Sequence, residues 1–104
     1  MEKAVLIRES DGKNIEYALE EGKPVVIGRG SDCDIKIPID WISRRHAEIN
    51  YKDDHYEIKD LGSSNGTSVN KDNIKNIPYK LKDNDKIILG GRGVLVFKLQ
   101  PQPA

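Results

Sequence analysis

The sequence predicts an all-β protein, a β-sandwich of two packed sheets. No window of the chain shows the apolar period of an amphipathic helix. The apolar residues fall in short runs or alternations, and turn-forming residues interrupt them roughly every eight to twelve residues, a spacing typical of sandwiches and barrels. About ten short strands in one domain must bury their apolar faces against each other, which gives two sheets.

The individual strands follow from these runs. We predict strands over residues 3–8, 15–19, 25–27, 34–37, 47–51, 56–61, 67–70, 74–77, 86–89 and 94–99. Clusters of glycine, proline, asparagine or aspartate separate several of them, at residues 10–13, 21–24, 52–54 and 90–93. Ala47, Ile49 and Tyr51 alternate with polar neighbours, which indicates a strand with one buried face.

Length and composition describe one ordinary globular domain. The chain has 104 residues, of which 37% are hydrophobic and 33% charged, and this length leaves no room for a second domain. We expect the domain to span residues 1–99 and a Pro-rich linker to follow over residues 100–104. The 17 basic residues balance the 17 acidic residues, which argues against a nucleic-acid partner.

The sequence also argues against a membrane or secreted protein. No run of residues approaches the ~20 apolar positions that a membrane span requires. The first residues lack the pattern of a signal peptide, so we expect a cytoplasmic protein. Cys33 is the single cysteine, and it therefore has no partner for a disulfide within the chain.

Three predicted loops carry the polar chemistry, and the first contains Arg29. This residue follows the apolar run 25–27 and lies between Gly28 and Gly30. Flanking glycines leave room around the guanidinium, and an arginine fixed at a strand end suits a phosphate or carboxylate ligand. On these residues alone, a solvated arginine in a tight turn is the favoured alternative.

The second loop contains Ser43, Arg44, Arg45 and His46. A hydroxyl, two guanidiniums and an imidazole in succession indicate an anion site. Strand alternation would send Ser43 and Arg45 to one side and Arg44 and His46 to the other. The alternatives are a charged edge strand for the arginines and a histidine that ties two loops together.

The third loop covers residues 61–67. Its Asn65-Gly66 pair alone is a hairpin signal that needs no function. Ser63 and Ser64 precede this pair, and their hydroxyls, with nearby backbone N–H groups, favour an anion-binding concavity.

Together the three loops resemble the forkhead-associated (FHA) domain family. The matching motifs are Gly28-Arg29, then Ser43-Arg44-Arg45-His46, then Ser63-Ser64-Asn65-Gly66-Thr67, with Val69-Asn70 completing the last block. The order and spacing of all three carry the resemblance, which covers roughly residues 3–99. It implies a sandwich of about eleven strands whose loops at one end bind phosphothreonine.

The resemblance also implies a role for individual positions. Arg29 and Ser43 would hold the phosphate, Ser64 would add a hydroxyl or backbone N–H, and Arg44 would be a further contact. Asn65 would bond to the main chain of the ligand, assisted by Asn70. Four residues would support the site structurally: Gly28, His46, Gly66 and Thr67, with His46 bracing the turn at Gly66.

Two further residues are candidates for ligand specificity. Trp41 lies two positions before Ser43, where the family often selects the third residue after the phosphothreonine. The loop 90–93 would form the opposite wall, with Arg92 as a contact. Lys71-Asp72-Asn73 departs from the family, in which a glycine often follows the asparagine at position 70.

The sequence also bears on two other classes of function. A nucleophilic enzyme would need Cys33 or Ser43 beside His46 and a carboxylate, but no nucleophile motif surrounds either residue. A zinc site needs three or four ligands, and besides carboxylates the chain offers only His46, His55 and Cys33. We therefore expect no catalysis, no metal and no cofactor. The closer alternative is an FHA-type sandwich that assembles with a partner without phosphate.

Overall fold

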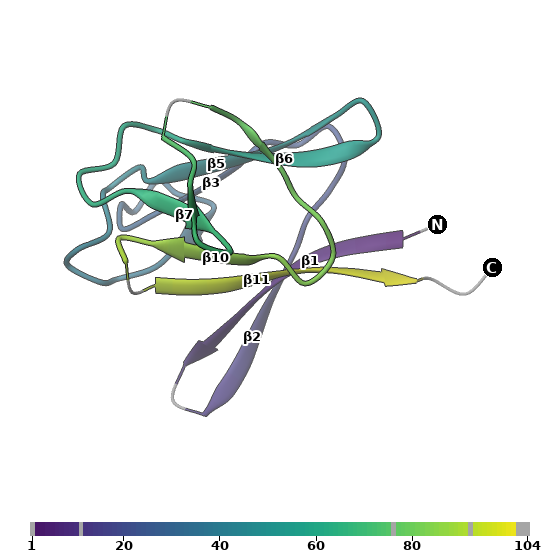
Figure 1. The fold of residues 1–104 in the computed structure, drawn as a ribbon. Coiled ribbons are helices and arrows are strands. Elements are labelled where there is room, and N and C mark those ends of the chain that lie inside the picture. The colour runs from purple at the N-terminus through teal and green to yellow at the C-terminus, as the bar shows by residue number, and fades with distance from the viewer. Residues whose placement is uncertain (1, 11, 76, 92, 102–104) are drawn as a thin grey trace.

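The computed structural model describes residues 2–10, 12–75, 77–91 and 93–101, and it is an all-β sandwich (Figure 1). Eleven strands occur in these ranges. They are β1 (Glu2–Ser10), β2 (Lys13–Ala18), β3 (Val25–Gly28), β4 (Ile35–Lys36), β5 (Ala47–Lys52), β6 (His55–Asp60), β7 (Thr67–Val69), β8 (Asp72–Asn73), β9 (Tyr79–Lys80), β10 (Lys86–Leu89) and β11 (Gly93–Pro101). The predicted fold class is therefore confirmed. Within the same ranges, no helix has the length and apolar character needed to cross a membrane.

The strands form two sheets that pack face to face. One sheet has the order β2-β1-β11-β10-β7-β8 and the other has the order β4-β3-β5-β6-β9. Leu6 and Phe97, a register pair of β1 and β11, face Ile49 and Ile58 of the second sheet in one buried cluster. Side chains of the inner faces interdigitate in this cluster, as in other β-sandwiches.

The β5–β6 hairpin shows how local sequence sets this architecture. Ala47 and Ile49 are buried while their neighbours reach the surface, as the alternation predicts. Lys52 pairs with His55 across a two-residue turn, and both turn residues, Asp53 and Asp54, have positive φ angles of 50° and 69°. This is the type I′ geometry that matches the twist of paired strands.

One predicted strand is wrong. Residues 74–77 were expected to be extended, but the backbone N–H of Ile77 donates to the Ile74 carbonyl and closes a turn. Ile74 is buried in the core and Ile77 is 68% exposed, so the turn directs the two side chains to different environments. The paired strands β8 and β9 lie on either side of this turn.

The last strand extends beyond its predicted end at Leu99. β11 continues to Pro101, which pairs with Glu2 of β1, so the sheet includes the first two residues of the expected linker. Residues 102–104 lie outside the described ranges.

All three polar loops lie at the same end of the sandwich. β3 leads into the loop 29–34, β5 begins after the loop 37–46, and β7 begins after the loop 61–66. These loops and the β10–β11 turn lie on the left in Figure 1, away from both chain ends. We call this the apical end.

Candidate functional site

Arg29 lies at the apical end of β3 and is anchored by its own backbone and side chain. Its N–H donates to the Ser43 carbonyl at 3.0 Å, and its Nε donates to the Ile42 carbonyl at 3.0 Å. The residue is exposed. Among the described residues, no hydrogen bond or ion pair uses its Nη1 or Nη2. The guanidinium is therefore fixed at one nitrogen and presents the other two to solvent.

Gly28 allows the second loop to approach β3. A Cβ at this position would lie 2.2 Å from the Arg44 carbonyl oxygen and 2.9 Å from the Ser43 carbonyl oxygen. The backbone N–H of Gly30 donates to the same Arg44 carbonyl at 3.0 Å. A side chain at position 28 would therefore push this loop away from Arg29.

His46 connects the second loop to the third. Its Nδ1 accepts a hydrogen bond from the Ser43 backbone N–H at 3.1 Å, which fixes the proton on Nε2. Nε2 lies 2.7 Å from the Gly66 carbonyl and so donates to it. The ring is completely buried, and both of its nitrogens are used. His46 thus ties loops together and presents no group to a ligand.

Ser43, Ser64 and Asn65 make further contacts between these two loops. The Ser64 backbone N–H donates to Ser43 Oγ at 3.1 Å, and Asn65 Nδ2 donates to the Trp41 carbonyl at 2.7 Å. Ser43 Oγ accepts in this contact, so its hydroxyl hydrogen can still donate elsewhere. Ser64 and Asn65 are both exposed.

Asp60 organises the third loop, although it is not among the predicted site residues. Its carboxylate accepts hydrogen bonds from the N–H of Gly62, the N–H and hydroxyl of Ser63, and the Thr67 hydroxyl at 2.7 Å. Burial alone would raise the pKa of Asp60, but these hydrogen bonds outweigh it and lower the pKa below its usual value. An aspartate three positions before a serine in a Gly-Ser turn is the signal that could have revealed this role.

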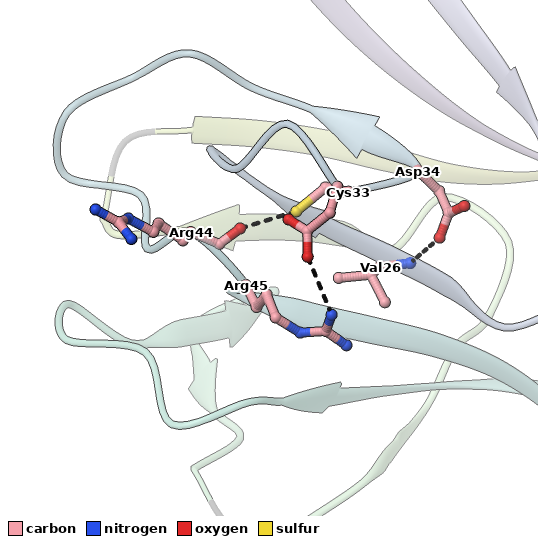
Figure 2. Close-up of polar contacts among 6 residues, drawn as sticks. Val26, Cys33, Asp34, Arg44 and Arg45 are labelled. Atoms are coloured by element: carbon pink, nitrogen blue, oxygen red, sulfur yellow. Dashed lines mark hydrogen bonds and ion pairs between the residues drawn. The ribbon is translucent and has the colours of Figure 1, made fainter.

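Arg44 and Arg45 point in different directions from the second loop, as Figure 2 shows. Arg45 Nη1 lies 3.4 Å from Asp32 Oδ2 in an exposed pair. Arg44 points outward, and its guanidinium has no hydrogen bond or ion pair with the residues that the structure describes. Its carbonyl accepts a hydrogen bond from Cys33 Sγ at 2.8 Å. Burial and the nearby Asp32 carboxylate raise the pKa of the Cys33 thiol.

The structure does not bring Asn70 to these loops. Asn70 follows β7 at the end away from Gly66, where its Nδ2 donates to Asp85 at 2.8 Å and its Oδ1 accepts the Lys86 backbone N–H at 2.9 Å. With φ at 60°, it turns the chain out of β7 and bonds to the scaffold.

Trp41 lies beside the β10–β11 turn. A Cβ at Gly90 would meet the Trp41 carbonyl oxygen at 2.7 Å and its Cδ1 at 2.9 Å. Gly90 also donates its N–H to the Gly66 carbonyl at 2.9 Å, so this turn joins the apical cluster. Arg92 lies outside the described residues.

The comparison with protein families is consistent with this geometry. The family model for the FHA domain matches residues 25–90, which include all three loops. The chain is an FHA domain. Its match contains Arg29, Ser43, His46 and the third loop, the residues that connect the apical end.

The relatives of this domain include longer proteins. This FHA domain is 37% identical to FhaA of Mycobacterium tuberculosis over 93 residues, 89% of this chain and 17% of FhaA. It is 35% identical to the glycogen accumulation regulator GarA of the same species, over 72% of this chain and 44% of GarA. It is 44% identical to the oxoglutarate dehydrogenase inhibitor of Corynebacterium jeikeium, over 61% of this chain and 42% of that protein. The chain therefore spans less than half the length of each relative.

Solved FHA domains have the same fold. One, from an analysis of phosphothreonine-dependent FHA domain interactions, has a TM-score of 0.81 and 33% identity, covering 96% of this chain and 99% of its own. The FhaA FHA domain complexed with the intracellular domain of Rv3910 has a TM-score of 0.78 and 35% identity, covering 90% and 99%. The MEK1 FHA domain in complex with the HOP1 pThr318 peptide has a TM-score of 0.74 and 27% identity, covering 92% and 95%.

Proposed function

We propose that this FHA domain is a phosphothreonine-dependent protein–protein interaction module. Arg29 and Ser43 hold the phosphate, Ser64 donates its hydroxyl, and Asn65 bonds to the main chain of the ligand. Arg44 is a further phosphate contact. Phosphothreonine brings about −1.5 to −2 charges and three acceptor oxygens at neutral pH, which matches a site made of donors.

The main support is the way Arg29 is held. Its backbone and Nε are bound to the second loop, and the same loop is bound to Ser64 through Ser43 Oγ. The free guanidinium nitrogens and the two serine hydroxyls thus belong to one connected cluster whose shape is set before a ligand arrives. Preorganised donors reduce the ordering cost of binding.

The Ser64 N–H has a smaller part in this proposal than its hydroxyl. That N–H already donates to Ser43 Oγ, so it holds the two serines together. The exposed hydroxyl of Ser64 is the group that remains for the phosphate.

Relatives support the choice of ligand. An FHA domain that is 33% identical comes from work on phosphothreonine-dependent interactions, and the MEK1 domain was solved with a pThr peptide. The ligand of this domain does not come from its own 104 residues, because Thr67 is their single threonine. Thr67 is 1% exposed and its hydroxyl bonds to Asp60. The partner is another protein or another part of a longer chain.

The proposal also covers the setting of the domain. We assign it a binding role without catalysis or a cofactor, since its relatives include a regulator and an enzyme inhibitor. A cytoplasmic setting accords with the FhaA domain, which was solved with an intracellular domain. Residues 1–99, with β11 continuing to Pro101, form the module in this proposal, and Trp41 and the loop 90–93 contribute to its ligand specificity.

A matched pair of arginine variants tests the site. Arg29→Ala should weaken binding of a library-selected phosphothreonine peptide about ten- to a hundredfold, because it removes a charge-assisted contact of about 1.5–3 kcal/mol. Isothermal titration calorimetry measures this loss directly.

Arg45→Ala is the control. Arg45 lies two residues from Ser43, but its guanidinium forms an exposed pair with Asp32, and such pairs contribute little. Its affinity should stay within about twofold of the parent. Equal affinities for the Arg29→Ala variant and the parent would contradict the assignment of Arg29 to the phosphate.

A further inference from the structure

A cleft lies where the sheet that contains β1 and β11 divides at the apical end. β1 and β11 pair from Glu2↔Pro101 as far as Ile7↔Val96. Beyond that point, β1 pairs only with β2 and β11 pairs only with β10. The β1–β2 hairpin projects away from the two packed sheets below β11 (Figure 1). The main chains of residues 8–10 and 93–95 therefore border the gap, and no strand pairing connects them.

Aliphatic and polar side chains both line this cleft. Its volume is about 440 Å³, and its lining includes Ile7, Ile39, Val94 and Val96. Val94 is 41% exposed, so part of its side chain is available to a ligand in the cleft. Arg8, Glu9 and Asn14 complete the lining and supply polar groups next to the open strand edges.

The cleft lies near the proposed phosphate site, because one of its lining residues belongs to the second loop. Ile39 belongs to the same loop as Ser43, and its carbonyl accepts the Ile42 N–H at 3.0 Å. Ile42 in turn accepts the Arg29 Nε. Ile39 and Ser43 are four positions apart in the chain, so their Cα atoms lie at most about 14 Å apart. A ligand segment of about four extended residues reaches from one site to the other.

We propose that this cleft is a second subsite for the same phosphopeptide, which binds an extended aliphatic segment flanking the phosphothreonine. The segment lies along an open strand edge of β1 or β11, a mode of recognition in which main-chain bonds give affinity and side-chain pockets give selectivity. An aliphatic side chain of the segment packs on Ile39, Val94 and Val96. The inference rests on the proposed function and adds to it the chemical character of the flanking sequence.

The test compares peptides of different length and character. The reference ligand is a short peptide with about three residues on each side of the phosphothreonine. It is extended first at one end and then at the other by a segment that contains leucines. A matched peptide has serines in place of these leucines. One leucine extension should bind about tenfold tighter than the short peptide, and the serine extension should not. Val94→Asp should remove this gain and leave the affinity for the short peptide within about twofold.

Ile77→Asp is the matched control. Ile77 is also an exposed aliphatic residue, at 68%, but it does not line the cleft. This variant should still bind the leucine extension more tightly than the short peptide. Amide chemical shifts of the parent protein give a readout that needs no variant: the leucine extension should perturb Ile7, Val94 and Val96, and the short peptide should not.

The outcomes separate the two proposals. If neither leucine extension raises the affinity, or if the increase in affinity persists in Val94→Asp, the subsite is overturned and the phosphothreonine proposal stands. Self-association of the unliganded chain that Val94→Asp abolishes assigns the cleft to a second copy and also overturns it. Failure of every phosphopeptide to bind, including the short one, overturns the proposed function and this inference with it.

Discussion

Gly28 contributes to the site by having no side chain. Its predicted supporting role now has a steric cause, since the Arg44 carbonyl occupies the space that a Cβ would take. Gly28→Ala should destabilise the domain by about 1–3 kcal/mol, as overpacking does. It should also weaken phosphothreonine-peptide binding, because the displaced loop carries Ser43 and anchors Arg29. Urea unfolding and calorimetry measure the two effects.

Gly12→Ala separates the steric effect from a general cost of replacing glycine. Gly12 has a φ angle of 76°, but a Cβ at this position would have no atom within 4 Å. Replacing Gly12 by alanine should therefore lower the free energy of unfolding only by the cost of this backbone conformation, roughly 1 kcal/mol. This variant should lose stability and keep its affinity. Unchanged peptide affinity in Gly28→Ala would contradict the steric account of the site.

At the scale of elements, the loop between β6 and β7 depends on one carboxylate. Asp60 accepts hydrogen bonds from two backbone N–H groups and two hydroxyls. Asp60→Asn should lower the free energy of unfolding by about 2 kcal/mol, because the amide nitrogen that replaces one carboxylate oxygen cannot accept a hydrogen bond from these donors. It should also loosen Ser64 and Asn65, which the loop carries.

The lowered pKa of Asp60 predicts a pH dependence with a definite sign. The unfolded carboxyl titrates near 3.8 and the folded one below that value, so the unfolded state binds more protons in between and stability falls as the pH drops through this window. In Asp60→Asn, the loss of stability below about pH 4 should be shallower than in the parent. Asp53→Asn, in the exposed β5–β6 turn, is the control and should not change the slope. Parallel curves for the parent and Asp60→Asn would contradict this role.

The β5–β6 turn is an element whose sequence is not optimal for its geometry. Asp54 has a φ angle of 69°, a conformation that glycine adopts without a Cβ penalty. Asp54→Gly should raise the free energy of unfolding by up to about 1 kcal/mol, because Asp-Gly is a preferred pair in type I′ turns. Thermal unfolding measures the gain. Peptide affinity should not change, since this turn lies at the end opposite the apical loops.

At the scale of the whole molecule, the sequence was sufficient for the sandwich and for the order of the three apical loops. Alternation in residues 47–51 identified a strand with one buried face, and the Asp53-Asp54 turn followed it. Individually, Arg29 and Ser43 each had a plain structural explanation. Their order and spacing, which the family model also matches, are what distinguished a site from three polar turns.

Other features depend on contacts between distant residues and have no local signal. Asn70 lies near the third loop in sequence, but β7 carries it to the other end of the sheet, where its amide bonds to Asp85 and Lys86. Residues 74–77 were predicted to form a strand, yet Ile74 enters the core and Ile77 faces solvent. The division of the sheet between β1 and β11 arises from their pairing, which no single segment encodes.

The central claim is that the apical end recognises a phosphorylated threonine. The most direct test titrates the parent domain with two peptides of identical sequence, one with phosphothreonine and one with threonine. Two charge-assisted contacts at about 1.5 kcal/mol each predict that the phosphorylated peptide binds about a hundredfold tighter. Equal affinity for the two peptides would contradict the account.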